Sequence, residues 1–414
     1  MKPFDHNAEL SRRDFVKVGV ASAAAAGISL PARAQDEQGE ALKPSEPLPA
    51  RVLGRTKEKV TILNLGAGRA PDARMLNAAY EAGIRFIDTA SGYANGESER
   101  NIAQWCQDTG NGKEMCIVTK HPSASPEEWV SNVDERLEAL KTDVIDVYFV
   151  HSIGDKREGS DDEGIEWPKM KEWAQAADKL KKSGKVRFVG FSCHSDMSKR
   201  VPILMNAVEG GWVDAVLVAY DPLSAKENAE FNKALDACYK AGIGLISMKE
   251  MRSVTAADVP KFMPDFKEMG LTPPQAVLHA CWSDERLVSV CSDMPNLRLL
   301  QENAEAARRF VKPLDEKQSA AVLDLYRRHG RRYCAACDGS CRRAAGTGAD
   351  LNTLARAWSY YEQDGCLGEA RKLYASLSPE ERNWHGADLA AATQACKSHL
   401  DFAAILPRVD QKLA

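Results

Sequence analysis

The chain has 414 residues, a net charge of −4 and a hydrophobic content of 44%. Positive and negative residues are interspersed, and beyond the arginine pairs at residues 327–328 and 331–332 there is no basic cluster, so nucleic-acid binding is not expected. The apolar content is sufficient for one large core and a smaller appended one.

The first 34 residues have the features of an export signal. Ser11-Arg12-Arg13-Asp14-Phe15-Val16-Lys17 precedes an uncharged, alanine-rich run at residues 18–32, which ends in the small-x-small sequence Ala32-Arg33-Ala34. This order resembles a twin-arginine signal and predicts a periplasmic or otherwise exported protein. The apolar run is too short for a stable membrane span, so the mature form is not expected to span a membrane. Residues 35–49 are predicted to be a flexible linker.

Eight short apolar runs of strand character alternate with amphipathic helical stretches between residues 50 and 312. The runs are residues 60–65, 85–88, 115–120, 144–151, 186–192, 214–220, 244–249 and 287–291. The helical stretches include residues 127–140, 173–182, 231–240 and 274–282. This alternation of strands and helices over about 260 residues predicts an α/β fold, a (β/α)8 TIM barrel.

Four polar residues follow apolar runs where a strand gives way to a loop: Asp88, Tyr93, Lys120 and His151. Because the strand C-termini of a barrel open onto one face, we expect the four to converge there. An ammonium beside a phenol lowers the phenol's pKa from its usual value of about 10, so Lys120 would make Tyr93 a better proton donor. Asp88 would supply the counter-charge for the lysine, and His151 would hydrogen-bond a substrate carbonyl oxygen. The pattern predicts a carbonyl-reducing site.

The sequences around these residues resemble the aldo-keto reductase family. The matching segments are RFIDTASGY at residues 85–93, VTK at 118–120, DVYFVHS at 146–152 and GKVRFVGFS at 184–192. Each member of that family's catalytic tetrad has a matching residue here. The resemblance implies NAD(P)-dependent hydride transfer between an alcohol and an aldehyde, ketone or sugar-like carbonyl compound, with Tyr93 as the proton donor.

The resemblance also implies where the dinucleotide phosphates would bind, which is the end of the eighth strand and the start of the next helix. The residues expected near them are Ser292, Asn296, Arg298, Glu302 and Asn303. Asp293 stands where the family usually has a glycine, and its carboxylate would repel a pyrophosphate unless the loop turns it away. No Lys-Ser pair for a 2′-phosphate is present, which favours NADH over NADPH.

Contacts to the nicotinamide are implied at the ends of the fifth and sixth strands. The family commonly ends the fifth strand with Ser-Asn, whereas this chain has Ser192-Cys193-His194. Cys193 cannot make the paired hydrogen bonds of an asparagine amide, but His194 can donate one. Tyr220 is either a stacking face for the nicotinamide or a packing residue at the barrel mouth.

Residues 313–414 are predicted to form a small helical domain, with helices at residues 351–363 and 368–377. They resemble a ferredoxin-like appendage found on some exported aldo-keto reductases. The run Cys334-Ala-Ala-Cys337-Asp-Gly-Ser-Cys341 is spaced for metal or iron-sulfur ligation, with Cys396 or Cys366 as a fourth ligand.

Three alternatives remain open for these cysteines. The first is one [4Fe-4S] cluster, which would link the protein to a redox partner. The second is zinc on the same thiolates together with His399. The third is a degenerate domain with disulfides, which persist in the oxidising periplasm. The cluster-binding relatives usually have Cys-Pro at the end of each motif, and the absence of such endings here counts against the cluster.

Two functions follow from these features. The first is the NAD(P)-linked oxidoreductase, which the four tetrad residues favour. The alternative is an exported non-catalytic or repurposed barrel that binds a ligand or redox partner. Asp293 and the export signal favour that alternative, because a free nicotinamide pool is not expected outside the cytoplasm.

Overall fold

The computed structural model describes residues 46–155, 162–250, 263–264, 266–329, 334, 339–362, 367–396, 398 and 400–414. The predicted export signal and most of the predicted linker lie outside these residues, as do Cys337, Cys366 and His399.

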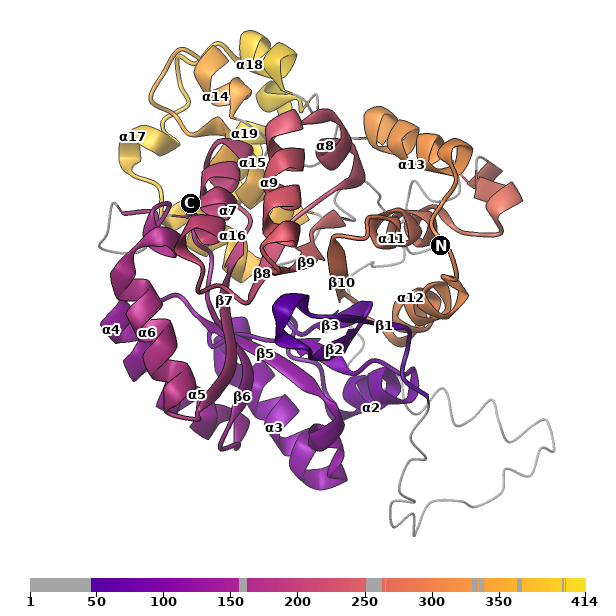
Figure 1. Cartoon of the computed structure of the whole chain (residues 1–414). Helices are drawn as coiled ribbons and strands as arrows, with labels where there is room; N and C mark the ends of the chain where they lie inside the picture. The colour runs from indigo at the N-terminus through magenta and orange to yellow at the C-terminus, as the bar shows by residue number, and fades with distance from the viewer. Residues whose placement is uncertain are drawn as a thin grey trace, which may run out of the picture. The chain divides into compact units, whose positions relative to one another are not determined.

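Eight parallel strands close into a barrel in the order β10-β3-β4-β5-β6-β7-β8-β9 (Figure 1). They are β3 (Leu63–Gly66), β4 (Phe86–Asp88), β5 (Cys116–His121), β6 (Ile145–Val150), β7 (Val186–Cys193), β8 (Ala215–Ala219), β9 (Gly244–Met248) and β10 (Leu287–Asp293). Each predicted run overlaps one of these strands, and the (β/α)8 barrel is confirmed.

The first predicted run divides between two sheets. Its beginning forms β2 (Lys59–Thr61), which pairs antiparallel with β1 (Ala50–Val52), and only its end enters the barrel as β3. Leu53 and Val60 are fully buried in the same cluster as the side chains that fill the barrel interior. The hairpin therefore closes one end of the barrel with apolar side chains.

The alternation of side chains along each strand decides which residues reach the barrel interior. The interior cluster contains Phe86 of β4, Val118 of β5 and Phe149 of β6. Ile87 of β4 belongs instead to the larger cluster between the strands and the surrounding helices. In β8, Leu217 faces the interior, and Val218 faces the helices.

Helices surround the barrel (Figure 1). They are α2 (Ala73–Glu81), α3 (Glu97–Thr109), α4 (Pro126–Ser131), α5 (Val133–Leu140), α6 (Lys171–Lys182), α7 (Met197–Gly210), α8 (Pro222–Glu227), α9 (Ala229–Lys240), α11 (Pro273–Ser283), α12 (Leu297–Arg309) and α13 (Glu316–His329). The stretch 127–140, predicted as one helix, is split into α4 and α5 at Asn132. The Asn132 side chain donates a hydrogen bond to the carbonyl of Glu128, 2.9 Å away, and such local bonds compete with a continuous helix.

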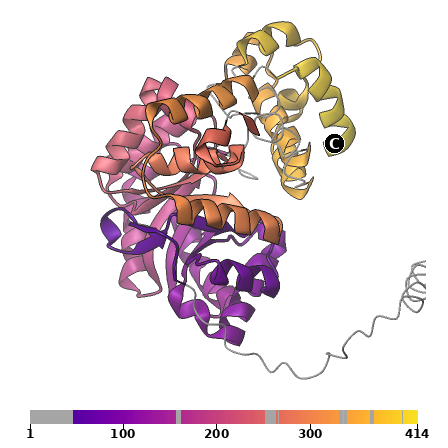
Figure 2. The same cartoon turned by 90° about the vertical axis from the view of Figure 1, so that its right-hand side faces the viewer.

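A second hydrophobic core lies in the C-terminal region, whose yellow helices form a compact group in Figure 2. The helices are α14 (Ser340–Ala344), α15 (Leu351–Glu362), α16 (Leu367–Ala375), α17 (Pro379–Arg382), α18 (Leu389–Ala395) and α19 (Phe402–Leu413). Helix α13 packs Val322, Leu325 and Tyr326 into the core around the barrel. The second core therefore begins after α13.

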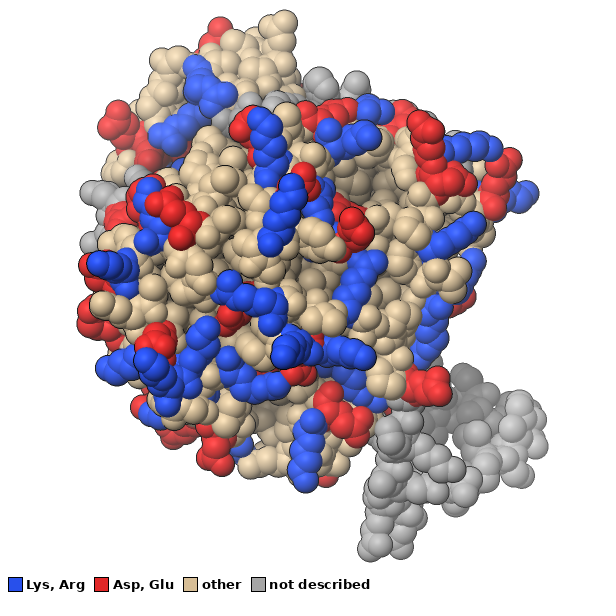
Figure 3. Space-filling view, viewed as in Figure 1, with Lys and Arg blue, Asp and Glu red and all other residues tan. Residues whose placement is uncertain are grey.

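Charged side chains of both signs are mixed over the face drawn in Figure 3. Within the described part of the chain, no helix combines the length and the apolar character that a membrane crossing needs.

Candidate active site

Lys120 is the centre of a buried polar cluster at the mouth of the barrel. Its Nζ donates hydrogen bonds to Asp88 Oδ1 and to the carbonyl of Thr89, both at 2.6 Å. The same nitrogen lies 3.4 Å from the Tyr93 hydroxyl. Lys120 has no exposed surface and Asp88 is only 3% exposed, so the ion pair is shielded from water. Such shielding strengthens the interaction of the ammonium with its neighbours.

Strand register places the two charged residues on the same face. Asp88 pairs with Val118, and Lys120 pairs with Phe149. Val118 and Phe149 both fill the barrel interior, so the charged side chains lie directly above an apolar floor. His151 follows β6 by one residue, which brings it to the same end of the barrel.

Tyr93 is held by a tight turn between β4 and α3. The turn spans Tyr93–Gly96, and Ala94 and Asn95 adopt left-handed backbone with φ of 47° and 54°. Such backbone is costly for residues other than glycine and is concentrated at functional sites. The Tyr93 and His151 rings meet edge to face, with centroids 5.7 Å apart. The structure therefore brings all four predicted tetrad residues together.

The charge on Asp88 depends on Lys120. Burial raises the pKa of the Asp88 carboxyl, and the Lys120 charge and its hydrogen bond oppose that rise. The Cys291 side chain, on β10, also lowers the pKa of this carboxyl. Cys291 is a site residue that the sequence analysis missed. The signal that could have found it is its place in the last barrel strand, where inward side chains reach the same mouth.

Two of the residues predicted to contact the nicotinamide line the mouth at the end of β7. Ser192 is buried, and its Oγ accepts a hydrogen bond from the backbone N–H of Ser152 at 2.9 Å. His194 Nε2 lies 3.2 Å from Ser152 Oγ, and its Nδ1 lies 3.3 Å from Asp155 Oδ2. Both residues are thus tied to the loop that follows His151.

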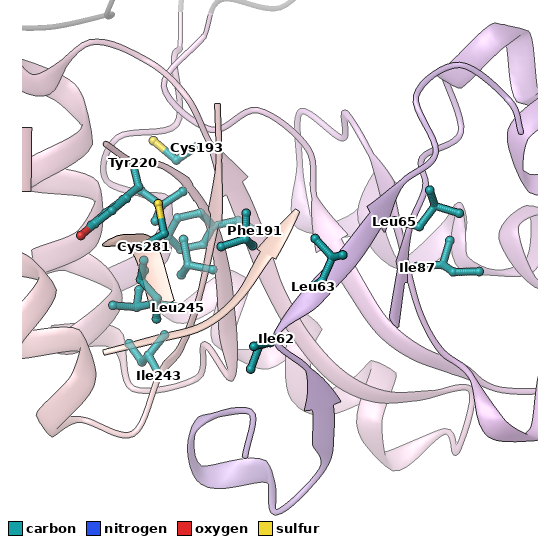
Figure 4. Packing of buried hydrophobic residues seen from close by; sticks show 14 of the residues in the cluster. Ile62, Leu63, Leu65, Ile87, Phe191, Cys193, Tyr220, Ile243, Leu245 and Cys281 are labelled. Carbon is teal, nitrogen blue, oxygen red and sulfur yellow. The ribbon is translucent and has the colours of Figure 1, made fainter. Parts of the chain in front are cut away.

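The other two face away from the mouth, which corrects the prediction for Cys193 and Tyr220. Both are buried in the core between the strands and the helices, where Figure 4 places Tyr220 beside Cys281. The Tyr220 hydroxyl donates a hydrogen bond to Asp284 at 2.9 Å, and its ring packs against Phe231. Alternation explains this: Ser192 and Ala219 precede them and point the other way. Of the two interpretations of Tyr220, packing is the one that the structure supports.

The residues predicted to bind the phosphates are found at the end of β10 and along α12. Asn303 donates a hydrogen bond to Ser292 Oγ at 3.1 Å, and both side chains are buried. Asn296 caps the first turn of α12. Arg298 and Glu302 form an exposed ion pair at 2.6 Å along that helix. Asn296 is therefore the member of this set nearest to the free N–H groups of the helix start.

Asp293 forms an ion pair across a hollow of about 240 Å³ between the loops that follow β3 and β10. Its Oδ2 lies 2.8 Å from Nε of Arg69, which follows β3. The side chains are 39% and 48% exposed for Arg69 and Asp293, so solvent screens the pair. The Asp293 carboxylate thus lies beside an arginine that the sequence analysis did not single out.

Comparison with known proteins places the chain in a family. The model of the aldo/keto reductase family matches residues 68–322, more than half of the 414 residues. The chain belongs to the aldo/keto reductase family. Seven of the eight barrel strands fall within the matched segment, and β3 (Leu63–Gly66) lies just before it.

The curated aldo/keto reductase relatives match parts of the chain. The aryl-alcohol dehydrogenase [NADP(+)] of Phanerodontia chrysosporium is 35% identical over 97 residues, which are 19% of this chain and 25% of that protein. The norsolorinic acid reductase stcV of Emericella nidulans is 34% identical over 93 residues, 19% of this chain and 24% of that protein. The chain thus spans about a quarter of the length of these relatives.

Solved aldo-keto reductases share the fold. The holo form of an enzyme from Bacillus halodurans has a TM-score of 0.53 at 17% identity, over 67% of this chain and 96% of that one. An aldo-keto reductase from Klebsiella pneumoniae in complex with NADPH has a TM-score of 0.53 at 20% identity, over 69% of this chain and 95% of that one. These likenesses support the barrel architecture.

The C-terminal cysteines are buried in the second core of this aldo/keto reductase. Cys334, Cys341 and Cys396 all belong to that core, and each is at most 6% exposed. Among the described residues, no three side chains of the metal-ligating types come together. Cys337, the remaining predicted ligand, lies outside the described residues. The three alternatives for the cysteines stay predictions.

Proposed function

We propose that the protein is an NAD(P)H-dependent oxidoreductase that interconverts an alcohol and an aldehyde, ketone or sugar-like carbonyl compound. The observation that carries the proposal is the water-shielded contact of Lys120 with both Asp88 and Tyr93 at the barrel mouth, with His151 against the phenol. Family membership and the names of the relatives, which are reductases and dehydrogenases, support the same reaction class.

Each tetrad residue has a distinct part in the proposed reaction. The Lys120 ammonium favours the phenolate that Tyr93 becomes when it gives its proton to the carbonyl oxygen. Asp88 keeps that ammonium charged and in place. His151 hydrogen-bonds the carbonyl oxygen and orients it toward the phenol. The reduced nicotinamide, when bound, supplies the hydride, and in the opposite direction the Tyr93 phenolate accepts the proton of the alcohol.

The mouth fits a dinucleotide in part. Ser192 and His194 face the position expected for the nicotinamide, and Arg69 lies beside the hollow near the start of α12, where backbone N–H groups favour a phosphate. Asp293 opposes an anion there. Relatives named for NADP(+), and the NADPH complex from Klebsiella pneumoniae, support NADPH, whereas the missing Lys-Ser pair favours NADH.

The experiment that tests the proposal is titration of the purified protein with NADH and NADPH, followed by assays with aldehydes, ketones and sugars. Binding with consumption of the reduced dinucleotide in the presence of a carbonyl compound supports the oxidoreductase. A protein that quenches neither dinucleotide's fluorescence and oxidises neither contradicts it. That result would favour the ligand-binding barrel.

Replacement of Asp293 by asparagine is expected to tighten dinucleotide binding. The change removes the carboxylate that faces the phosphates and releases Arg69 from its ion pair, so we expect Kd to fall by about 2- to 5-fold, as for an exposed pair worth up to about 1 kcal/mol. Fluorescence titration at low salt measures it. Asp134→Asn is the matched control. Asp134 lies on α5 and forms an exposed ion pair with Lys185 at 2.6 Å. An unchanged or raised Kd for Asp293→Asn would show that the carboxylate does not limit binding.

Export by the twin-arginine route is part of the proposal. Replacement of both Arg12 and Arg13 by lysine is expected to leave the folded protein in the cytoplasm, because the pathway reads the arginine pair and not positive charge alone. Cell fractionation and immunoblotting measure the distribution. Lys17→Arg, which keeps the pair and the net charge, is the control. Undiminished periplasmic protein from the double-lysine variant excludes this route.

No step of the proposed reaction passes through the C-terminal cysteines. Their described members do not converge as a ligand set, and Cys334 Sγ instead contacts the carbonyl of Asn352 at 3.4 Å. Iron and zinc analysis of anaerobically purified protein, together with a thiol count, distinguishes the cluster, zinc and disulfide alternatives. A [4Fe-4S] cluster would give about four irons per chain.

A further inference from the structure

The backbone immediately after His151 is strained. Ser152 has a φ of 57°, in the left-handed region that residues other than glycine rarely adopt. Such a conformation persists only where the surroundings hold it in place. Three contacts hold Ser152: its N–H donates to Ser192 Oγ at 2.9 Å, its carbonyl accepts from the N–H of Asp155 at 3.3 Å, and its Oγ lies 3.2 Å from His194 Nε2. The direction in which His151 leaves β6 therefore depends on Ser192 and His194.

His194 is itself held by a residue from the C-terminal region. Its Nδ1 lies 3.3 Å from Asp155 Oδ2, and Asp155 Oδ1 lies 3.1 Å from Nη2 of Arg356, on α15. The other terminal nitrogen of Arg356 donates a hydrogen bond to the backbone carbonyl of His194 at 3.2 Å. One guanidinium thus contacts both the side-chain partner and the main chain of the residue that supports Ser152.

The Arg356–Asp155 ion pair is largely shielded from solvent. The side chains are 7% and 15% exposed, so solvent screens the pair far less than a surface pair. Burial alone would raise the pKa of the Asp155 carboxyl, but the charges of Arg356 and His194 hold this pKa at about 2. Asp155 therefore stays ionised at neutral pH.

The same face of α15 reaches a second barrel strand. Tyr360 lies one helical turn beyond Arg356, and its ring centroid is 4.8 Å from Nζ of Lys249, which follows β9. Residues four apart share a helix face. Helix α15 therefore meets the barrel at two places on the catalytic end, which limits its freedom to shift.

We propose that Arg356 is a positioning residue for His151. Through Arg356, the C-terminal helical region contributes to the active site of the barrel. The guanidinium fixes Asp155 and His194, these fix the left-handed Ser152, and Ser152 sets the direction of the preceding His151. A displacement of a catalytic group by about 1 Å costs on the order of 10²-fold in rate, so loss of this support reaches the reaction. The catalytic part of this inference rests on the proposed oxidoreductase function.

The first test compares Arg356→Met with Arg408→Met in the full chain. Arg408 lies in the same region, 61% exposed and 3.8 Å from Glu362, and serves as the matched control. For Arg356→Met we expect kcat for carbonyl reduction to fall by at least about 10-fold with the dinucleotide Kd unchanged. Arg408→Met should match the wild type in both. Wild-type kcat in folded Arg356→Met overturns the proposal.

A second variant removes the charge imbalance that Arg356→Met leaves behind. The double variant Asp155→Asn/Arg356→Met has no carboxylate left without its partner. It should therefore unfold at a higher denaturant concentration than the single variant Arg356→Met. We expect its kcat to remain at least about 10-fold below that of the wild type. Recovery of wild-type kcat in this double variant would mean that Arg356 acts only through stability, and the proposal fails.

A readout without turnover separates this inference from the proposed function. The chain has 8 histidines, so the His151 imidazole signals can be assigned in NMR spectra by comparison with His151→Gln. These signals should shift in Arg356→Met and stay unchanged in Arg408→Met. If the wild type reduces no carbonyl compound but the His151 signals shift as expected, the positioning stands and the proposed function fails. Unshifted His151 signals in Arg356→Met overturn the positioning.

Ser152→Gly tests the strained residue itself. Glycine adopts left-handed backbone at no steric cost, so it needs less support from His194 and Arg356. Combining Ser152→Gly with Arg356→Met should therefore lower kcat by clearly less than the product of the two separate effects. Effects that multiply independently would show that Arg356 does not act through Ser152.

Discussion

Replacement of Tyr93 by phenylalanine is expected to lower kcat for carbonyl reduction by about 10²-fold or more, as loss of a general acid does. The change removes one hydroxyl, which lies 3.4 Å from Lys120 Nζ and is the proton donor of the proposed reaction. The ring remains, with its edge-to-face contact to His151. Steady-state kinetics with a reduced dinucleotide and a responsive carbonyl substrate measure the effect.

Tyr239→Phe is the control for this substitution. Tyr239 is 47% exposed on α9, so the same chemical change there should leave kcat at the wild-type value. The dinucleotide Kd and the denaturation midpoint of Tyr93→Phe should stay close to those of the wild type, because the substitution removes one hydroxyl and keeps the ring. A Tyr93→Phe variant that turns over at the wild-type rate would remove Tyr93 from the role of proton donor.

The barrel could be predicted because its strands are buried on both faces. Parallel strands of this kind appear in the sequence as continuous apolar runs, and the eight runs found in the sequence all overlap strands. The hairpin of β1 and β2 could not be separated from the first run. Val60 is as buried as the strand that follows it, and β1 has only three residues, too few to show a period.

The tetrad could be predicted because each residue lies within a recognisable local sequence at a strand end. The outward direction of the Cys193 and Tyr220 side chains could also have been predicted from the sequence. Each follows a residue whose side chain points inward, Ser192 and Ala219, and successive side chains of a strand point to opposite faces. The Arg69–Asp293 pair joins residues separated by 224 positions, and Arg356 meets Asp155 across 201 positions. Contacts at such separations depend on how the loops and the C-terminal helices pack, and no local pattern encodes them.

Replacement of Lys120 by methionine is expected to abolish turnover and to lower the free energy of unfolding by about 3–5 kcal/mol at neutral pH, as removal of one member of a buried ion pair does. Methionine fills a similar volume, so the loss comes from the unpaired Asp88 carboxylate and not from a cavity. Asp88 is 3% exposed, and burial already raises its pKa against the effect of Lys120. Without the ammonium, that pKa rises further.

The destabilisation of Lys120→Met should therefore depend on pH with a definite sign. The pKa of an aspartate in the unfolded chain is about 3.9. When the pKa is higher in the folded protein, the aspartate does not lower the free energy of unfolding below a pH of about 3.9. Its destabilising effect grows as pH rises from there toward the folded pKa. Urea unfolding at pH 5 and pH 7 should show a smaller difference from the wild type at pH 5. Asp88→Asn combined with Lys120→Met removes the charge, so this double variant should lose the pH dependence and be more stable than Lys120→Met at pH 7. An equal loss at both pH values would mean that the Asp88 carboxylate is not the group left unpaired by the missing ammonium.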